Sequence, residues 1–338
     1  MVLSSIVFFA TMLGAAILTR HVRRYALERN LVDLPNARGL HEKMLPRGGG
    51  AAIVIVVSLC LIVLQRNALI DERLAVLWVG CGVGFGLLGW VDDHIDISSL
   101  IRFISQLVLA SGFCIAVFMQ SSAETLWWAE AWRLLGTVFV SVAIVWFVNL
   151  YNFMDGADGF AGSEAVVVAS AGAFISGAFG QIDTMLLSLA IAGATAGFLI
   201  WNWEPARIFL GDVGSYFLGF QFCALTIYDL YFGAAPWKWL ILLSPFITDA
   251  TLTLLRRMFK RERWWQAHRS HIYQLLILHG RSHAKVSVSL AVGTLLVLFP
   301  IAWISVEQPV LAPQLAGVTY VLTGIIWFLL RKKFDSSI

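Results

Sequence analysis

Charged residues are scarce in this chain. Of its 338 residues only 13% are Asp, Glu, Lys or Arg, whereas 59% are hydrophobic and the mean hydropathy is +0.79. Soluble domains carry about 25% charged residues, so this composition excludes an ordinary soluble domain and predicts a polytopic membrane protein. The net charge of +3 is small and the cations are confined to a few stretches, so no nucleic-acid partner is expected.

Cysteine is also rare. The four cysteines lie inside apolar runs without paired spacing: Cys60, Cys81, Cys114 and Cys223. This pattern excludes a disulfide framework and a thiolate zinc site, and it indicates small side chains within the core.

Basic residues are missing before the first apolar run, 2–19, whereas Arg20, Arg23 and Arg24 follow it. A cleavable secretory signal has the reverse order of charge. We therefore expect a retained first span whose N-terminus lies outside.

Long apolar runs make up most of the chain. A helix needs about 20 apolar residues to cross a bilayer. On that basis we predict an all-α polytopic membrane protein with about eleven transmembrane helices in a single domain, residues 1–338. The predicted spans are 2–19, 48–65, 74–91, 100–119, 133–148, 161–179, 184–201, 213–231, 237–256, 285–305 and 311–330.

The basic residues predict the orientation of these spans, because Lys and Arg concentrate in cytoplasmic loops. Of the 24 Lys and Arg residues, only Arg66, Arg73, Arg133 and Lys238 fall on the side opposite to the rest. The side that holds the remaining Lys and Arg residues also carries the polar motifs. We therefore expect the active site at the cytoplasmic face.

Asp92 and Asp93 stand at the cytoplasmic end of the third run. Adjacent carboxylates invite a cation or raise one pKa towards use as a base, although a solvated Asp-Asp pair is the simpler interpretation. Arg102, at the start of the next run, either faces a phosphate or marks the boundary of the span.

The most specific stretch runs from Asn149 to Gly162. Asn149 and Asn152 are three residues apart, as are Asp155 and Asp158, and on a helix this spacing puts each pair on one face. Oxygen ligands of this kind suit Mg²⁺, which takes one or two carboxylates together with phosphates. A turn-rich Asp-Gly junction is the alternative.

Asp212 opens the eighth run, after Phe209-Leu-Gly. It is a candidate N-cap of that helix, and the same carboxylate can also bind a metal ion. Neither interpretation excludes the other.

Two cytoplasmic loops are basic. The loop 20–47 ends in Lys43 and Arg47 before Gly48-Gly-Gly50, whose backbone amides can approach an anion closely; flanking charge with a flexible turn is the alternative. The loop 256–285 contains His268 and His271 at helical spacing, which can bind an anion or lie against an anionic leaflet.

Asp249 lies inside the ninth predicted span. An intramembrane carboxylate is a functional candidate, but it can also hydrogen-bond to neighbouring Thr residues.

Together these motifs resemble the polyprenyl-phosphate N-acetylhexosamine-1-phosphate transferases, glycosyltransferase family 4, whose superfamily includes the phospho-MurNAc-pentapeptide transferases. The resemblance runs from about residue 33 to 284 and rests on Asp92-Asp93, the block 149–158 and the stretch 209–215. The stretch 266–271 looks most like the branch that initiates O-antigen or similar surface polysaccharides, as in lipopolysaccharide synthesis.

This resemblance implies transfer of an N-acetylhexosamine 1-phosphate from a UDP-sugar to undecaprenyl phosphate, giving undecaprenyl-diphospho-sugar and UMP. It implies Mg²⁺, or Mn²⁺ in its place, and a location in the bacterial inner membrane. The implied catalytic residues are Asp92, Asp93, Asp155 and His271, and the implied metal ligands are Asn152 and Asp212. The expected substrate-binding residues are Lys43, Arg47, Arg102, Asn149, Asp158, Asn202, Phe209 and Arg269, of which Asp158, Asn202 and Phe209 match positions that contact uracil.

The chain departs from the family pattern in two places. Relatives often carry His-x-His-His in the last cytoplasmic motif, but here the run is His271-Ile-Tyr273-Gln274. Of the three histidines in that pattern only His271 is present here. Tyr273 and Gln274 stand in place of the other two, and neither side chain can be positively charged near neutral pH. Arg102 stands where many relatives have Lys, and its planar fork changes the contact geometry.

Other functions fit less well. A secondary transporter usually has its site near the midplane on broken helices of related repeats, and no repeat is evident here. CDP-alcohol phosphotransferases also begin a motif with Asp-Gly, but Asp158-Gly-Phe-Ala-Gly162 lacks the Arg that follows it there. A catalytically silent scaffold of a polysaccharide assembly complex is the remaining alternative.

The sequence leaves open which sugar is carried (GlcNAc, GalNAc, FucNAc or QuiNAc), whether the reaction passes through a covalent intermediate, and the oligomeric state.

Overall fold

A computed structural model describes residues 2–33, 44–95, 97–119, 127–231, 235–263 and 268–336. Within these residues the chain is helical apart from one antiparallel pair of two-residue strands. The elements are α1 (Val2–Glu28), β1 (Val32–Asp33), β2 (Leu45–Pro46), α2 (Ala51–Arg66), α3 (Glu72–Ile95), α4 (Ser99–Met119), α5 (Trp127–Phe153), α6 (Phe160–Ala178), α7 (Ile182–Asn202), α8 (Gly211–Tyr231), α9 (Trp237–Leu242), α10 (Ser244–Phe259), α11 (Ile272–Leu278), α12 (His283–Gly293), η1 (Thr294–Leu298), α13 (Phe299–Glu307), η2 (Pro309–Leu311) and α14 (Ala312–Asp335).

Eight helical segments of the described chain are long and apolar enough to cross a membrane. They are α1, α3, α4, α5, α6, α7, the series α12–η1–α13 and the pair η2–α14. The all-helical, multi-pass architecture predicted from the sequence is therefore confirmed. The other three predicted spans coincide with α2, α8 and the α9–α10 pair, which are not among the eight.

Helices α1 and α7 pack closely because two glycines of α7 leave room for the backbone of α1. A Cβ on Gly197 would lie 2.0 Å from Met12 O, and one on Gly193 would lie 2.3 Å from Phe8 O. Small residues at such crossings are typical of membrane helices, whose association depends on close van der Waals contact.

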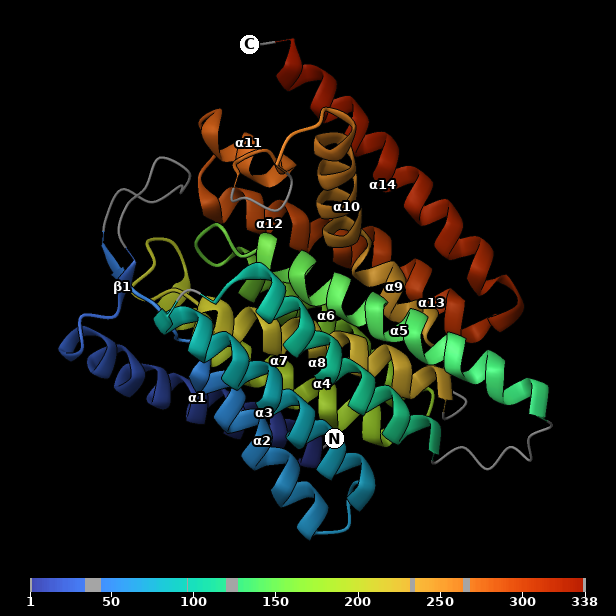
Figure 1. Ribbon diagram of the computed structural model, residues 1–338. Helices are drawn as coiled ribbons and strands as arrows, with labels where there is room; N and C mark the ends of the chain where they lie inside the picture. Colours follow the sequence, from blue (N-terminus) through green and yellow to red (C-terminus); the bar gives the residue numbers. More distant parts are fainter. Residues whose placement is uncertain are drawn as a thin grey trace.

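Helix α3 lies against α8 in the same way. A Cβ on Gly89 would lie 2.2 Å from Asp212 O, and one on Gly82 would lie 2.7 Å from Gln221 Nε2. Figure 1 shows α2 to α8 running in broadly similar directions, with β1 at one end of this bundle.

The C-terminal part is less regular. The ninth predicted span is interrupted at Leu243, before Pro245 in the first turn of α10, and Figure 1 shows α10 crossing the direction of the bundle. In the next span the π-helical turn η1 comes just before Pro300. Proline has no N–H to donate to the carbonyl four residues earlier, here that of Leu296, so the regular helical ladder cannot continue there.

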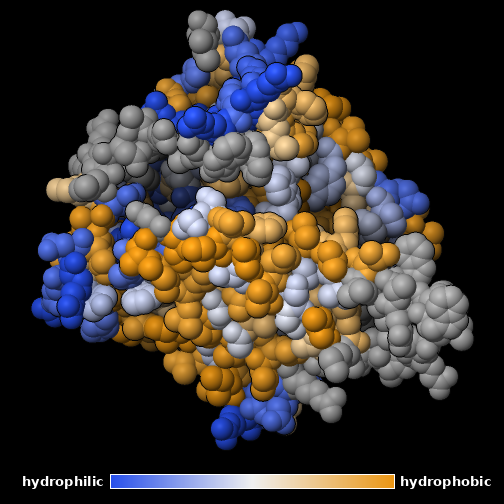
Figure 2. Space-filling model, in the orientation of Figure 1, coloured by the Kyte–Doolittle hydropathy of each residue, from blue (hydrophilic) through white to orange (hydrophobic). Residues whose placement is uncertain are grey.

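Apolar side chains cover the outside of the molecule as well as its interior. In Figure 2 hydrophobic residues form a broad field over the middle of the visible face, and hydrophilic residues gather towards its margins. This distribution is typical of a protein whose solvent is the bilayer.

Candidate active site

The end of α3 meets the start of α8, and Asp93 joins them. Its Oδ1 accepts a hydrogen bond from Asp212 N (3.1 Å) and its Oδ2 accepts one from Val213 N (3.2 Å). The first N–H groups of a helix have no intrahelical partner and favour a negative charge. Asp212, a candidate N-cap from the sequence, lies in the first turn of α8, and Asp93 of α3 supplies the capping carboxylate.

Asp92 is held from three directions. Its Oδ2 accepts hydrogen bonds from Arg102 Nη1 (3.2 Å) and Tyr216 Oη (2.8 Å), and its Oδ1 accepts one from Ile97 N (2.8 Å). The Asp92 side chain is only 5% exposed, whereas that of Arg102 is 22% exposed. Asp92 therefore fixes Arg102, and the guanidinium stays accessible to an anion.

A second arginine lies beside the acidic pair. Arg47 Nε is 4.0 Å from Asp93 Oδ1, and the Arg47 side chain is 31% exposed. The predicted phosphate-contacting residue Lys43 lies outside the described residues. Arg47 and Arg102 thus present two accessible cations next to two buried carboxylates.

Asn152 connects the end of α5 to the first turn of α8. Its Nδ2 donates hydrogen bonds to Asp212 Oδ1 (2.6 Å) and to Ser215 Oγ (2.9 Å). The structure therefore brings together the two residues that the sequence predicted as metal ligands. The role of metal ligand stays a prediction.

Asp155 lies in the loop that follows α5. Burial raises the pKa of its carboxyl well above the ordinary value, and the negative charges of Asp212, Asp93 and Asp158 raise it further. Like charges crowded in a low dielectric repel each other strongly. A cation between them would relieve this repulsion.

These residues fit Mg²⁺. Across the described parts of the chain, no group of three or more His, Cys, Asp and Glu side chains gathers as a complete ligand set. Mg²⁺ does not need one, because it usually keeps several waters and binds one or two carboxylates together with substrate phosphates. The raised pKa of Asp155, caused in part by Asp212, indicates where a cation is favoured.

The glycine run after Arg47 does not form the anion cradle that we considered from the sequence. Gly49 N donates to Phe209 O (2.9 Å) and Gly50 N donates to Leu210 O (2.8 Å), so these amides are already used. A Cβ on Gly50 would lie 2.2 Å from Gly214 Cα. The glycines therefore allow the loop before α2 to pack against the start of α8.

Asp158 and Asn202 hold two loops together. Asn202 Oδ1 accepts a hydrogen bond from Gly159 N (3.0 Å), and its Nδ2 donates to Ile208 O (2.9 Å). Asp158 Oδ2 accepts one from Ala206 N (3.0 Å). Both side chains are buried and the nearby Phe209 is half-buried; contact of these three residues with uracil stays a prediction.

Asn149 lies one turn before Asn152 and faces α4. Its Nδ2 donates to Gln106 Oε1 (2.6 Å) and to Val145 O (2.8 Å). These bonds fix α5 against α4 close to the acidic pair. Substrate binding by Asn149 is not tested by this geometry.

His271 is the N-cap residue of α11 and is buried. Its ring stacks on Phe153 and Tyr273, with centroids 6.4 and 6.0 Å away. Burial, and then the positive charges of Arg257 and Arg331, lower its pKa to about 3. His271 is therefore neutral near pH 7 and can exchange a proton or donate one hydrogen bond, but it supplies no charge.

The loop around His271 is anchored by Asp249 of α10. The carboxylate accepts hydrogen bonds from Ile272 N (2.9 Å) and from Trp327 Nε1 of α14 (3.1 Å). Asp249 thus has a structural partner on each side. Arg269 lies exposed on the same loop, where it is accessible to an anion.

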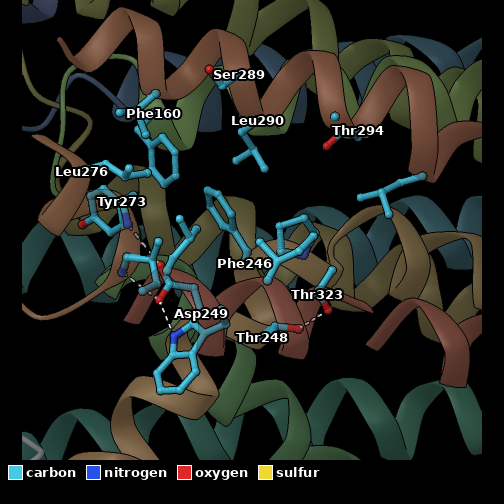
Figure 3. A pocket seen from close by; sticks show the side chains of 18 of the residues that line it. Phe160, Phe246, Thr248, Asp249, Tyr273, Leu276, Ser289, Leu290, Thr294 and Thr323 are labelled. Atoms are coloured by element: carbon cyan, nitrogen blue, oxygen red, sulfur yellow. Dashed lines mark hydrogen bonds between the residues drawn. The ribbon is translucent and has the colours of Figure 1, made fainter. Parts of the chain in front are cut away.

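An apolar cavity of about 980 Å³ begins next to this loop. It lies between α6, α10, α12 and α14, and Figure 3 shows Phe160 and Leu290 pointing across it towards Phe246. Met154, the residue before Asp155, belongs to its wall, as do Arg281 and Lys285 near the start of α12. Apart from Asp249, Arg281 and Lys285, the described charged residues of this part of the chain lie outside the cavity wall, which is mostly apolar.

Known proteins are similar in sequence to this chain over most of its length. The chain is 31% identical over 284 residues to a protein of Bacillus subtilis (strain 168) named "Probable undecaprenyl-phosphate N-acetylglucosaminyl 1-phosphate transferase", which covers 82% of this chain and 78% of that protein. The profile of Glycosyl transferase family 4 matches residues 75–229. The chain belongs to glycosyl transferase family 4.

More distant relatives of this family 4 transferase are phospho-N-acetylmuramoyl-pentapeptide-transferases. One from Listeria monocytogenes serovar 1/2a is 28% identical over 259 residues, which covers 72% of this chain and 77% of that protein. One from Bacillus pumilus is 30% identical over 203 residues, covering 54% and 60%. The matched segment 75–229 contains the acidic pair, the block 149–158 and Asp212.

Three residues of the transferase site were not predicted from the sequence. Tyr216 bonds to Asp92, Ser215 accepts from Asn152, and His283 Nδ1 accepts from Asp158 N (3.0 Å). Tyr216 had a detectable signal, because a position four residues after Asp212 lies on the same helix face. His283 had none, since it is 125 residues from its partner.

Proposed function

We propose that this protein transfers an N-acetylhexosamine 1-phosphate from a UDP-sugar to undecaprenyl phosphate, producing undecaprenyl-diphospho-sugar and UMP. The named activity of the B. subtilis relative supports the substrates. The observation that carries the proposal is the contact between Asn152 and Asp212 beside the acidic pair, because it gathers oxygen ligands and arginines at one point.

The chemistry requires that negative charges be brought together. The attacking phosphate and the diphosphate of the donor repel each other, and Mg²⁺ would neutralise the diphosphate and stabilise the departing UMP. Asn152 and Asp212 are the residues that would hold Mg²⁺. Asp155 is close enough to interact electrostatically with Asp212.

The arginines prepare the site for the acceptor. Asp92 holds Arg102 by a 3.2 Å ion pair, and Asp93 lies 4.0 Å from Arg47. In this arrangement Arg102 and Arg47 bind the lipid phosphate and orient it for in-line attack, with Arg269 as a further cation at the exposed rim. Asp92 and Asp93 thus contribute to catalysis by fixing the position and charge of these arginines.

The hydrocarbon chain of the acceptor lies in the apolar cavity. Its walls are open to the bilayer, since Val288, Val297 and Ile326 are 49%, 51% and 57% exposed. Met154, the residue before Asp155 in the sequence, belongs to the cavity wall. A lipid held there would carry its phosphate towards the polar site.

The protein crosses the bacterial inner membrane eleven times, with its N-terminus outside and the site at the cytoplasmic face. The distribution of Lys and Arg supports this orientation. In the cell the reaction would initiate O-antigen or a similar surface polysaccharide, as the stretch 266–271 indicates.

Lipid-dependent release of UMP tests the proposal. Purified full-length protein is incubated with undecaprenyl phosphate, Mg²⁺ and UDP-GlcNAc, UDP-GalNAc, UDP-FucNAc or UDP-QuiNAc, with and without EDTA. We expect UMP only with acceptor and metal, and the best donor identifies the sugar. Asp212→Asn should lower the rate about a hundredfold or more, whereas Asp183→Asn in α7 should not.

A folded wild-type protein that releases no UMP from any of these donors would refute the transferase proposal. The catalytically silent scaffold would then be the better interpretation. Isotope exchange between UMP and the UDP-sugar without acceptor distinguishes the covalent route from direct attack, because only a covalent intermediate permits it.

A further inference from the structure

Tyr216 connects two carboxylates that belong to different helices. Its Oη lies 2.8 Å from Asp92 Oδ2 at the end of α3 and 3.4 Å from Asp212 Oδ2 on its own helix, α8. The ring is completely buried. Tyr216 follows Asp212 by four residues, so both side chains lie on one face of α8.

A phenol has a single proton, whereas an ionised carboxylate only accepts hydrogen bonds. Tyr216 can therefore donate to one of its two neighbours at a time, and the shorter distance assigns the donor to Asp92. Arg102 donates to the same oxygen of Asp92. The hydroxyl is thus the uncharged member of a three-residue cluster that contains one cation.

The hydroxyl also separates two negative charges. Asp93 accepts a hydrogen bond from the backbone N–H of Asp212, and Asn152 donates one to its Oδ1. The other carboxylate oxygen, Oδ2, faces the hydroxyl of Tyr216, which lies between Asp212 and Asp92. In a buried site an unshielded pair of carboxylates is costly. The hydroxyl spaces the two carboxylates and, by donating to Asp92, stabilises one of the two charges without adding another.

We infer that Tyr216 is a positioning residue of the transferase. Its hydroxyl holds Asp92, and through Asp92 also Arg102, at a fixed position relative to the carboxylate of Asp212 that would bind the cation. The inference rests on the proposed function, because its consequence is the alignment of the acceptor phosphate on Arg102 with the donor diphosphate at Asp212. Tyr216 touches neither substrate and acts through these two residues.

The variant Tyr216→Phe keeps the ring and removes only the hydroxyl. Asp92 then loses one of its donors, and Asp212 faces its charge directly. A hydrogen bond to a charged group is strong enough that we expect kcat to fall about tenfold to a hundredfold. The KM for the UDP-sugar should stay within about twofold, because the cation-binding groups themselves remain.

The chain offers a matched control on the same helix. Tyr228 lies three turns further along α8 and donates from Oη to Asp183 Oδ2 (3.1 Å), which repeats the Tyr–Asp contact at the opposite end. Tyr228→Phe should lower the melting temperature as much as Tyr216→Phe does. Its kcat should be that of the wild type.

Binding of Mn²⁺, followed by electron paramagnetic resonance without substrates, gives a readout that does not depend on turnover. Asn152 and Asp212 remain in Tyr216→Phe, so its Mn²⁺ affinity should stay within about twofold of the wild type while it turns over more slowly. A merely structural role would weaken both properties together.

An unchanged kcat in Tyr216→Phe, or a joint loss of kcat, Mn²⁺ affinity and melting temperature, would overturn the inference. If the wild type itself releases no UMP, the proposed function fails, whereas an active wild type with an unchanged kcat in Tyr216→Phe overturns the positioning role alone. The two failures are therefore distinguishable.

Discussion

At the scale of single residues, the acidic side chains divide into two kinds. Asp92 and Asp93 accept hydrogen bonds from N–H and O–H donors of the protein. Asp155 instead faces other carboxylates. The first kind organises arginines and a helix terminus, and the second kind is left for a cation.

Asp155→Asn should stabilise the protein in the absence of metal. Its pKa is raised in the folded state, so the folded protein binds more protons than the unfolded chain and loses stability as the pH rises above the ordinary value of about 4. The Asn variant removes this loss. We expect a higher melting temperature in EDTA at pH 7, a smaller gain on adding Mg²⁺, and little activity.

The measurement is thermal unfolding in detergent between pH 5 and 8, with Asp183→Asn as the control for an Asp outside the site. A melting temperature of Asp155→Asn at or below that of the wild type in EDTA would contradict the repulsion described for this site.

The sequence indicated which motif residues meet, but it did not indicate how they are held. The resemblance to family 4 paired Asn152 with Asp212 as metal ligands, and the structure places the two side chains in contact. The donors of Asp92 could not be predicted, because they depend on how α3, α4 and α8 cross. The capping of α8 by Asp93 escaped prediction for the same reason.

At the scale of elements, the site depends on helices that pack with their backbones nearly touching. The α1–α7 and α3–α8 crossings both need glycine where one helix meets the other. Apolar runs predicted these helices well, since length and hydropathy are local properties. The interruption at Leu243 and the π-helical turn η1 were not predicted, although Pro245 and Pro300 carried the signal.

Gly197→Ala tests the α1–α7 crossing. The added Cβ would meet Met12 O at 2.0 Å, so the helices must separate and we expect a melting temperature several degrees lower. Gly317→Ala in α14 is the matched control, because no atom lies within 4 Å of its Cβ position and alanine favours a helix by about 1 kcal/mol over glycine. Equal melting temperatures for the two variants would disprove the close crossing.

At the scale of the whole molecule, an apolar field covers the middle of the visible face and hydrophilic residues lie towards its margins (Figure 2). The orientation that the placement of Lys and Arg predicts, with the site at the cytoplasmic face, stays a prediction. The lateral cavity could not be predicted, because its walls come from segments as distant as α6 and α14.

Labelling of single introduced cysteines tests the orientation. Val310, between α13 and α14, is 84% exposed, and Lys260, after α10, is also exposed. In spheroplasts a membrane-impermeant maleimide should label Val310→Cys before lysis and Lys260→Cys only after lysis. Wild-type protein, whose four cysteines lie within helices, provides the background. The reverse pattern would place the site outside.

The proposed entry of the acceptor through the cavity between α10 and α14 has a kinetic consequence, because several wall residues of the cavity are apolar and exposed. An acceptor that enters there arrives by two-dimensional diffusion and never passes through water. The enzyme then responds to the mole fraction of acceptor among the surrounding lipids and not to its molarity in the suspension. Turnover in the cell is accordingly governed by the surface density of undecaprenyl phosphate, and inert lipid dilutes the substrate even when the total amounts stay constant.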